Sequence, residues 1–352
     1  MTNSVISTKP LESPWQGLDP FLFAVHHVDN YPAGDGRLGI KPEDRAKEGQ
    51  GWRMYHGDHV PGFPAHPHRG FETVSIVLKG YIDHADSLGG AARYGQGDVQ
   101  WLTTGGGVEH GEMFPLVNTD KPNTMEMFQI WLNLPPEGKS AEPAFGMFWA
   151  EDIPVVEKGG AKVTVIAGPF GDVRPLSPPK DSWAADPSHE LAIWLIDIDK
   201  GGSLILPTAS MEALRRAYIY EGTATFDGQV QPQSHLVNLD ASRVTTIRND
   251  GDQRVRILLL QSKPIEAPVV ARGPFVLNTA EEMIQTVTRY QSEGFGRWPW
   301  PTRAHTHGDE GRFIKYPDGR RETPAKATAD YKRQSWHTGR QTLARISISL
   351  YV

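Results

Sequence analysis

Two short motifs, each with two metal-ligating residue types spaced two residues apart, stand out in this sequence of 352 residues. They are His-Pro-His at residues 66–68 and His-Gly-Glu at residues 110–112. In a β-strand, residues i and i+2 point to the same face, so each motif aims two side chains in one direction. Two adjacent strands of a barrel would therefore bring four ligands to one interior point: His66, His68, His110 and Glu112.

Three neutral imidazoles and one carboxylate form a mixed nitrogen and oxygen ligand set. Such a set suits a borderline divalent transition metal, namely Fe, Mn, Co, Ni, Cu or Zn. With an octahedral metal, four protein ligands leave two positions for water, dioxygen or a chelating substrate. That arrangement is typical of a catalytic site rather than of a closed structural site.

Weaker signals lie near these motifs or share their spacing. The three glycines at residues 105–107 are followed by neither a helix pattern nor a Lys-Ser/Thr pair, which argues for a tight turn and against a phosphate-binding loop. Glu109 alternates away from the ligands and is predicted to be a surface or supporting residue. Gly70 lies on the ligand face, where it either leaves room for a bound molecule or marks a strand irregularity. The His-Thr-His at residues 305–307 lies in a polar segment and is not predicted to bind metal.

The ligand motifs lie among short apolar runs that Gly, Pro or Asp bound, as in a β-sandwich or barrel. The 36 Gly and 28 Pro favour many short strands and turns over long helices. Residues 32–58, which are rich in Gly and charge, are predicted to form a long loop. The predicted strands cover residues 73–78, 98–102 and 127–132 in the first half of the chain, and residues 191–196, 217–220, 235–239 and 255–260 in the second half.

The two halves look like a diverged internal repeat. Residues 77–80 and 219–222 both end a strand with a charged residue and a Gly, where a tight turn needs a positive φ. Aligning them puts Thr208 and Ser210 where the first half has its His-Pro-His motif, and residues 247–249 hold no His or Glu. The sequence therefore predicts one metal per chain and none in the second half. Three other residues there are predicted to be ordinary surface or loop residues: His189, Glu190 and His235.

One helix is predicted near the end of the second half. Thr279 and Glu282 match a capping box, an apolar stripe follows, and Gly294 suits the C-terminal stop. From residue 297 onward, 11 Lys and Arg face 5 Asp and Glu. We expect this basic tail to be solvated, with contact to an acidic surface as the alternative. Residues 343–350 alternate well enough to form a strand.

The composition excludes several classes of protein. Without cysteine there can be no disulfide, thiolate ligand or cysteine nucleophile. No apolar run approaches the roughly 18 residues of a membrane helix, and the first residues lack the pattern of a secretory signal. The net charge of −6 disfavours direct nucleic-acid binding. We therefore expect a cytoplasmic protein. We also expect a monomer.

Several longer stretches resemble the signature of the pirin family, in the family's order. They lie at residues 66–74, 86–89, 97–101, 105–112, 129–135 and 273–279. The resemblance extends from about Leu18 to Gly296 and leaves residues 297–352 uncovered. It implies two stacked cupin (jelly-roll) β-barrels, with iron, most simply Fe(II), bound in the N-terminal one at the four positions named above. It departs from the family at residues 24–30 and in the long, Gly-rich loop after them.

The combined prediction divides the chain into three parts. Residues 1–150 form a metal-binding N-terminal cupin, residues 151–296 form a C-terminal cupin that ends in a helix, and residues 297–352 form an extra basic tail. The resemblance implies either a flavonol (quercetin) 2,3-dioxygenase using O₂ or a non-catalytic, redox-sensitive regulator of a protein partner. A purely structural metal is the third alternative. In the enzyme, Glu112 would be the catalytic base, a role assigned by analogy.

Overall fold

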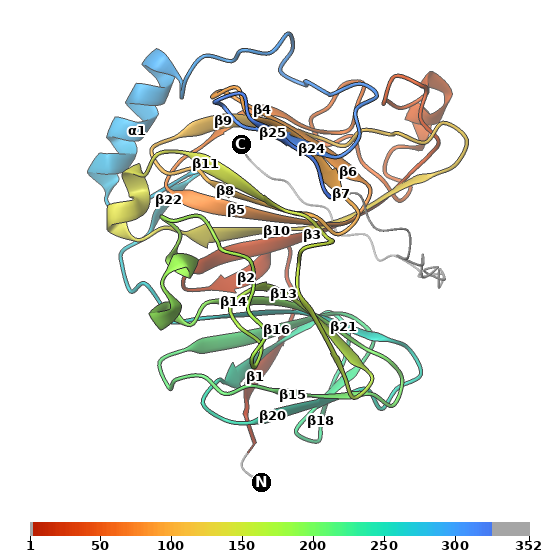
Figure 1. Ribbon diagram of the computed structural model, residues 1–352, viewed down its shortest axis with the longest axis vertical. Helices are drawn as coiled ribbons and strands as arrows, with labels where there is room; N and C mark the ends of the chain where they lie inside the picture. Colours follow the sequence, from red (N-terminus) through yellow and green to blue (C-terminus); the bar gives the residue numbers. More distant parts are fainter. Residues whose placement is uncertain (1–2, 326–352) are drawn as a thin grey trace.

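The computed structural model describes residues 3–325 and shows two β-barrels stacked along the long axis of the molecule (Figure 1). Strands predominate, and α1 (Ala280–Glu293) is the one α-helix among the described residues. The predicted all-β fold with two stacked barrels and a short C-terminal helix is therefore confirmed. No helix within residues 3–325 is long and apolar enough to cross a membrane. The same part of the chain contains four short 3-10 helices: η1 (Pro42–Lys47), η2 (Pro136–Ser140), η3 (Trp183–Ala185) and η4 (Pro187–His189).

The first barrel is built from two six-stranded antiparallel sheets that face each other. One sheet carries the ligand motifs and has the strand order β25 (Arg321–Glu322), β24 (Phe313–Lys315), β7 (Ala91–Gly95), β6 (Tyr81–Asp86), β9 (Val108–Met113), β4 (Gly62–His68). The other has the order β11 (Ala144–Phe148), β8 (Val99–Thr103), β5 (Phe71–Lys79), β10 (Asn123–Asn133), β3 (Phe21–Tyr31), β2 (Trp15–Leu18). Large apolar residues fill the barrel away from the ligands, among them Tyr31, Ile82, Tyr94 and Met125.

The second barrel pairs a seven-stranded sheet with a four-stranded one. The larger has the order β1 (Val5–Pro10), β19 (His235–Asp240), β16 (Leu214–Glu221), β21 (Val255–Ser262), β14 (Ala192–Ile198), β13 (Ala161–Ala167), β12 (Val155–Lys158). The smaller has the order β15 (Ser203–Leu206), β20 (Thr245–Arg248), β17 (Ala224–Phe226), β18 (Gln229–Gln231). β1 thus joins the second barrel although its residues fall within the predicted first domain, because it pairs with β19, which would otherwise be an open edge.

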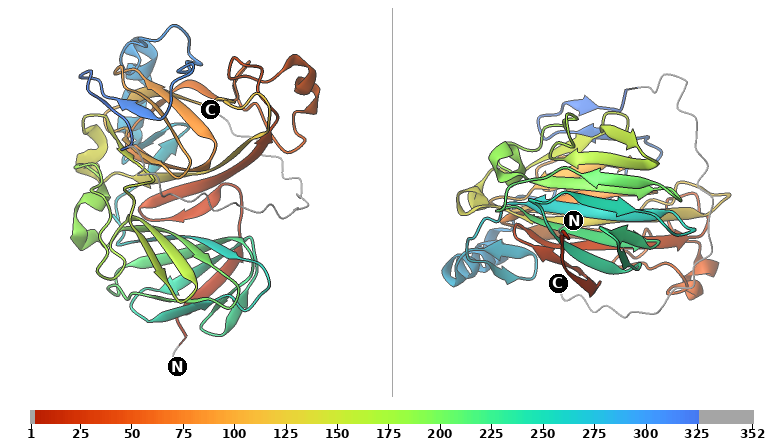
Figure 2. Two further views of the ribbon diagram at one scale, coloured as in Figure 1. Left: turned by 45° about the vertical axis from the view of Figure 1, so that its right-hand side comes forward. Right: turned by 90° about the horizontal axis from the view of Figure 1, so that it is seen from below.

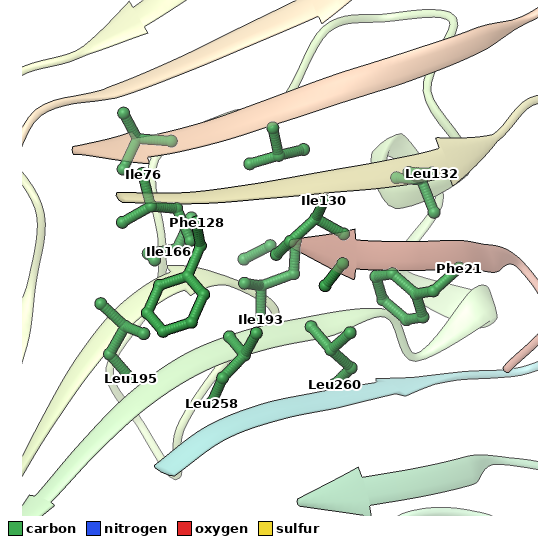
Figure 3. Packing of buried hydrophobic residues seen from close by; sticks show 14 of the residues in the cluster. Phe21, Ile76, Phe128, Ile130, Leu132, Ile166, Ile193, Leu195, Leu258 and Leu260 are labelled. Atoms are coloured by element: carbon green, nitrogen blue, oxygen red, sulfur yellow. The ribbon is translucent and has the colours of Figure 1, made fainter. Parts of the chain in front are cut away.

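The two barrels share an apolar core where the β10-containing sheet of the first barrel faces the seven-stranded sheet of the second (Figure 3). In β10, even-numbered residues point into this core, whereas odd-numbered residues point into the first barrel, as strand alternation requires. Phe128, Ile130 and Leu132 therefore pack against residues of the second barrel, and Gln129 and Trp131 are left for the interior of the first. Residues contributed by the second barrel include Ile193, Leu195, Leu258 and Leu260.

The predicted helix α1 forms as expected and packs against the first barrel. The Thr279 side chain accepts from the backbone of Glu282, whose side chain caps Thr279 in return, and Gly294 ends the helix. The hairpin of β22 (Val270–Arg272) and β23 (Phe275–Leu277) lies beneath it. Tyr290 donates a hydrogen bond to Glu109 of β9 at 2.7 Å, so the end of the second predicted domain is attached to the ligand-bearing sheet.

Residues 297–325 also pack on that sheet, which corrects the expectation of a solvated tail (Figures 1 and 2). β24 pairs with β7, and Phe313 and Ile314 are buried. The buried guanidinium of Arg93 forms an ion pair with Asp83 and donates to the backbone carbonyl of Gly308 at 2.9 Å. The high density of basic residues concealed this short apolar strand, whose partner lies more than 200 residues earlier in the chain. The strand predicted at residues 343–350 lies outside the described residues.

Candidate metal centre

The histidines converge because strands β4 and β9 pair antiparallel, with His66 directly opposite His110. One ring nitrogen from each of His66, His68 and His110 lies within 4.8 Å of the others. β4 is at the edge of its sheet, where Pro67 removes no hydrogen bond that the sheet needs. The structure therefore brings together the three histidines that the sequence selected, on the barrel interior.

The three imidazoles have the protonation state that metal ligation requires. His68 and His110 are buried, and burial is the main cause that lowers the pKa of each well below its usual range. Burial also lowers the pKa of His66, which is partly exposed. The His66 Nδ1 lies 2.9 Å from the Pro64 carbonyl, so it carries the proton and leaves Nε2 unprotonated.

A second, independent observation also indicates that these histidines suit a metal ion. Neither ring nitrogen of His110 has a hydrogen-bond partner among residues 3–325, although the side chain is fully buried. A buried polar atom without a partner is costly, and such an atom calls for an explanation. A cation bound among the three imidazoles would supply the missing partner for one nitrogen of His110.

Glu112 lies beside this cluster rather than within it. Its Oε2 is 3.8 Å from His110 Nε2, and its side chain is buried. Both carboxylate oxygens accept hydrogen bonds from Gln129 Nε2, at 3.0 and 2.9 Å. The Gln129 carbonyl oxygen in turn accepts from the indole nitrogen of Trp131 at 3.3 Å. Glu112 is therefore held next to the histidines by a hydrogen-bonded chain from β10.

Gln129 is the supporting residue that motif spacing alone did not reveal. It belongs to one of the stretches that resemble pirins, yet no role followed from that. The alternation of side chains along a strand could have revealed it. Gln129 and Trp131 are i and i+2 in β10, so their side chains share the interior face. A polar amide on an otherwise apolar interior face needs a partner, and that partner is Glu112.

Aromatic rings line the barrel around the histidines. Trp131 stacks on Phe71 at a centroid distance of 4.1 Å and lies 5.2 Å from the ring of His68. The ring of Phe23 also lies 4.5 Å from that of Trp131. Phe23 and Trp131 are both partly exposed, as is His66.

The long loop of residues 32–58 borders this site. Its residue Tyr55 lies 4.9 Å from the ring of Phe63, and Phe63 pairs in register with Glu112. Tyr55 also forms an edge-to-face contact with His27 of β3 at 5.1 Å. The segment in which the sequence departs from the pirin pattern is therefore part of the mouth of the barrel.

The remaining residues selected from the sequence have structural roles. Gly70 has a φ of 86°, and a Cβ there would lie 2.0 Å from the Val276 carbonyl oxygen, so it serves a turn and leaves no space for a ligand. The glycines at 105–107 form the turn before β9. Glu109 is buried and bonded to Tyr290, so it is a supporting residue. In the 305–307 motif, His307 Nε2 bonds the backbone carbonyl of His84 at 2.8 Å and His305 stacks on Trp300.

The interior of the second barrel is apolar. The strands that correspond to β4 and β9 are β15 and β20, and they contribute Leu204, Leu206 and Ile247 to its core. Thr208 and Ser210 follow β15, and the Ser210 hydroxyl donates to the carboxylate of Glu190. His189 stacks on Trp183, and its Nδ1 bonds the Trp183 carbonyl at 2.8 Å, whereas His235 Nδ1 lies 3.1 Å from the Gln233 carbonyl.

An open cleft of about 510 Å³ lies at the junction of the two barrels, and its lining includes none of the metal-site residues. Its lining combines residues that follow β10, such as Glu137 and Ser140, with residues of the segment before β14, such as Lys180, Ser182 and His189. The Ser182 hydroxyl donates to the buried carboxylate of Glu72 at 2.6 Å. The histidine cluster and this surface cleft are therefore two separate sites.

Comparison with known proteins agrees with this fold. The family model for pirin matches residues 12–132, and the model for the pirin C-terminal cupin domain matches residues 193–296. A Pseudomonas aeruginosa protein named "Putative quercetin 2,3-dioxygenase" is 36% identical over 244 residues, which are 66% of this chain and 80% of that protein. Human pirin is 31% identical over 253 residues, which are 69% of this chain and 81% of that protein.

The fold is also that of a solved structure. The crystal structure of quercetin 2,3-dioxygenase from Acinetobacter baumannii superimposes with a TM-score of 0.68 at 23% identity, covering 84% of this chain and 99% of that one. At this identity the likeness concerns the fold alone. The family models and the curated relatives together show that this chain belongs to the pirin family.

Proposed function

We propose that this protein is a metal-dependent oxygenase that opens the central ring of a flavonol such as quercetin with O₂. The observation that carries the proposal is the convergence of three neutral imidazoles beside a buried carboxylate, with the partly exposed rings of Trp131 and Phe23 next to them. The name of the Pseudomonas aeruginosa relative supports the substrate class.

One divalent transition metal per chain would be held by His66, His68, His110 and Glu112. Fe(II) is the proposed ion, and Mn, Co, Ni, Cu and Zn suit the same donors. When bound there, the metal would supply Lewis acidity toward a substrate hydroxyl and a place for dioxygen.

The protein side chains would bind and orient the substrate. A flavonol is flat and aromatic, so it can pack against Trp131 and Phe23, which are partly exposed. Packing there places a ring hydroxyl toward the histidines and excludes water from the reacting face. The wall is rigid, because Trp131 is stacked on the fully buried Phe71.

Glu112 is the proposed base. Its carboxylate would accept the proton of the flavonol 3-hydroxyl, while Gln129 holds the carboxylate in place through two hydrogen bonds. Over the whole reaction one O₂ is consumed, both its atoms enter the ring-opened ester, and one ring carbon leaves as carbon monoxide. General-base assistance of this kind contributes about 10²–10⁴-fold to a rate.

Aerobic assays with a flavonol panel test the proposal. Quercetin should disappear with equal amounts of O₂ taken up and carbon monoxide released, and His66→Ala and His110→Ala should each abolish turnover with loss of metal. In Glu112→Gln, which keeps an oxygen donor but removes the charge, turnover should fall far more than metal content. A proportional fall would make Glu112 a ligand only. A fully metallated wild type that turns over no flavonol with any of several metals would contradict the enzyme and favour the redox-sensitive regulator.

A further inference from the structure

A second polar cluster lies at the mouth of the first barrel, outside the candidate metal centre. The Tyr55 hydroxyl donates to Asp29 Oδ2 at 2.7 Å and lies 2.8 Å from His27 Nδ1. The other oxygen of Asp29 accepts from the backbone nitrogen of Arg53 at 3.0 Å. Asp29 and His27 come from β3, whereas Tyr55 and Arg53 come from the long loop.

The direction of each hydrogen bond in this cluster is determined by the chemistry of its members. Burial raises the pKa of Tyr55, so the phenol keeps its proton. Burial raises the pKa of Asp29 to about 6 and lowers that of His27 to about 4, so at neutral pH the carboxylate is charged and the imidazole is neutral. The single phenolic proton goes to the carboxylate, and Tyr55 must therefore accept the Nδ1 proton of His27.

This arrangement leaves His27 Nε2 as an acceptor with a lone pair. It has no hydrogen-bond partner among residues 3–325, and the side chain is partly exposed. In many catalytic sites an aspartate selects the tautomer of a histidine by accepting its ring proton. Here Asp29 has the same effect on His27, but through the hydroxyl of Tyr55. The tautomer of His27 is therefore determined before any ligand binds, with Nε2 as the unprotonated nitrogen.

The imidazole lies on the same interior face as the residues that hold Glu112. In β3, His27 pairs with Met127 of β10. Two residues earlier in β3, Val25 pairs with Gln129, whose amide donates to Glu112. Two residues of a strand span roughly 7 Å. On the opposite sheet Phe63 lies between the two regions, 6.1 Å from the ring of His27 and 6.3 Å from that of His66.

The loop holds Tyr55 in an uncommon conformation. Its φ of 56° is in the left-handed region, where a large aromatic residue is rarely found. The loop is anchored independently by the Tyr31 hydroxyl, which donates to the Arg53 carbonyl at 2.8 Å. Tyr55 is therefore not the only tether of this loop, and its strained placement points to a role at the site.

We infer that His27 Nε2, oriented by Tyr55 and Asp29, accepts a hydrogen bond from a second hydroxyl of the aromatic substrate, remote from the one beside Glu112. This inference rests on the proposed function, since it names the part of the substrate that the loop recognises. The protein would then prefer aromatic ligands with several hydroxyls over those with one. The residues responsible lie where this chain departs from the pirin pattern.

Anaerobic binding measurements on the metal-loaded protein test it. Quercetin carries several hydroxyls, whereas 3-hydroxyflavone carries only the one beside the ketone. The wild type should prefer quercetin, and His27→Phe and Tyr55→Phe should each reduce that preference by about three- to tenfold, the range of one neutral hydrogen bond. His27→Gln, which can offer its amide oxygen, should restore part of it. Metal content should stay at the wild-type level in all variants.

Tyr31→Phe is the matched control, because it removes a hydrogen bond to the same loop without touching His27. An unchanged preference in both His27→Phe and Tyr55→Phe would overturn the inference. So would an equal loss in Tyr31→Phe, which would show that the cluster only tethers the loop. If the wild type binds and discriminates the two flavonols but never turns them over, the proposed enzyme fails while this inference stands. A wild type that binds neither refutes both.

Discussion

Gln129 Nε2 contacts both carboxylate oxygens of Glu112, at 3.0 and 2.9 Å, and thereby determines where the one acidic residue of the candidate metal centre lies. The two residues belong to opposite sheets of the first barrel, so the contact also connects the ligand-bearing sheet to the one that faces the second barrel. Without it, the Ser75 hydroxyl, at 3.4 Å, would be the remaining side-chain donor to this carboxylate within residues 3–325.

Replacing Gln129 with Met should weaken the site while keeping the volume of the side chain. Loss of a hydrogen-bonding partner of a metal ligand commonly costs about 10–100-fold in metal affinity or activity. We expect a fall of that size in metal affinity, measured by competition with a chelator. Gln285→Met, on the exposed face of α1, is the control and should leave affinity unchanged. Equal affinities for Gln129→Met and wild type would show that the contact does not support the ligand.

Removing the metal should lower the melting temperature without unfolding the protein. A ligand that binds the folded state alone adds about 2.7 kcal/mol when its free concentration is roughly a hundredfold above Kd. We expect about one equivalent of metal per chain, and a chelator-dependent shift that is absent in His110→Ala. The control His305→Ala should behave like wild type, because His305 stacks on Trp300 outside the cluster. Complete unfolding on chelation would indicate a structural metal instead.

Removing residues 297–325 should destabilise the first barrel, because this segment packs on the ligand-bearing sheet. The comparison is between a chain that ends at Ala325 and one that ends at Gly296. The shorter chain exposes the edge of β7 and leaves Arg93, which is buried, without the Gly308 carbonyl. An unsatisfied buried group costs about 1–3 kcal/mol. The free energy of unfolding in urea should fall by at least that amount, and equal stabilities would mean that this segment packs without contributing.

Glu72 should make stability depend on pH. It is fully buried near the junction of the barrels, and burial raises its pKa from 4.5 to about 7. Because the folded state holds this proton more tightly than the unfolded state, its contribution is fully present below about pH 4.5 and is lost as pH rises toward 7. The loss corresponds to roughly 3 kcal/mol.

Glu72→Gln removes this titration, so its stability relative to wild type should rise between about pH 5 and pH 8. Urea unfolding at intervals of pH measures the difference, and any contribution of bound metal is common to both proteins. Glu137→Gln, an exposed residue of the neighbouring cleft, is the control and should show no such trend. A difference that does not vary with pH would mean that Glu72 stays ionised in the folded protein.

The sequence by itself determined which three histidines converge, the pattern of short strands and the capped helix. These features depend on local rules: alternation in a strand gives His66 and His68 one direction, and the capping box of Thr279 and Glu282 involves residues three apart. The same alternation, applied to Gln129 and Trp131, would have placed both in the barrel, although it could not have named Glu112 as the partner.

Only the tertiary structure decided which distant residues complete the site. Tyr55 reaches Asp29 and His27 across a loop whose path no periodicity describes, and Gly308 meets Arg93 from 215 residues away. It also decided that Gly70 serves a turn, because the nearby Val276 carbonyl belongs to a different predicted domain. Such contacts depend on how complete sheets pack and twist together. A contact between segments far apart in the chain leaves no periodic pattern in the sequence of either segment.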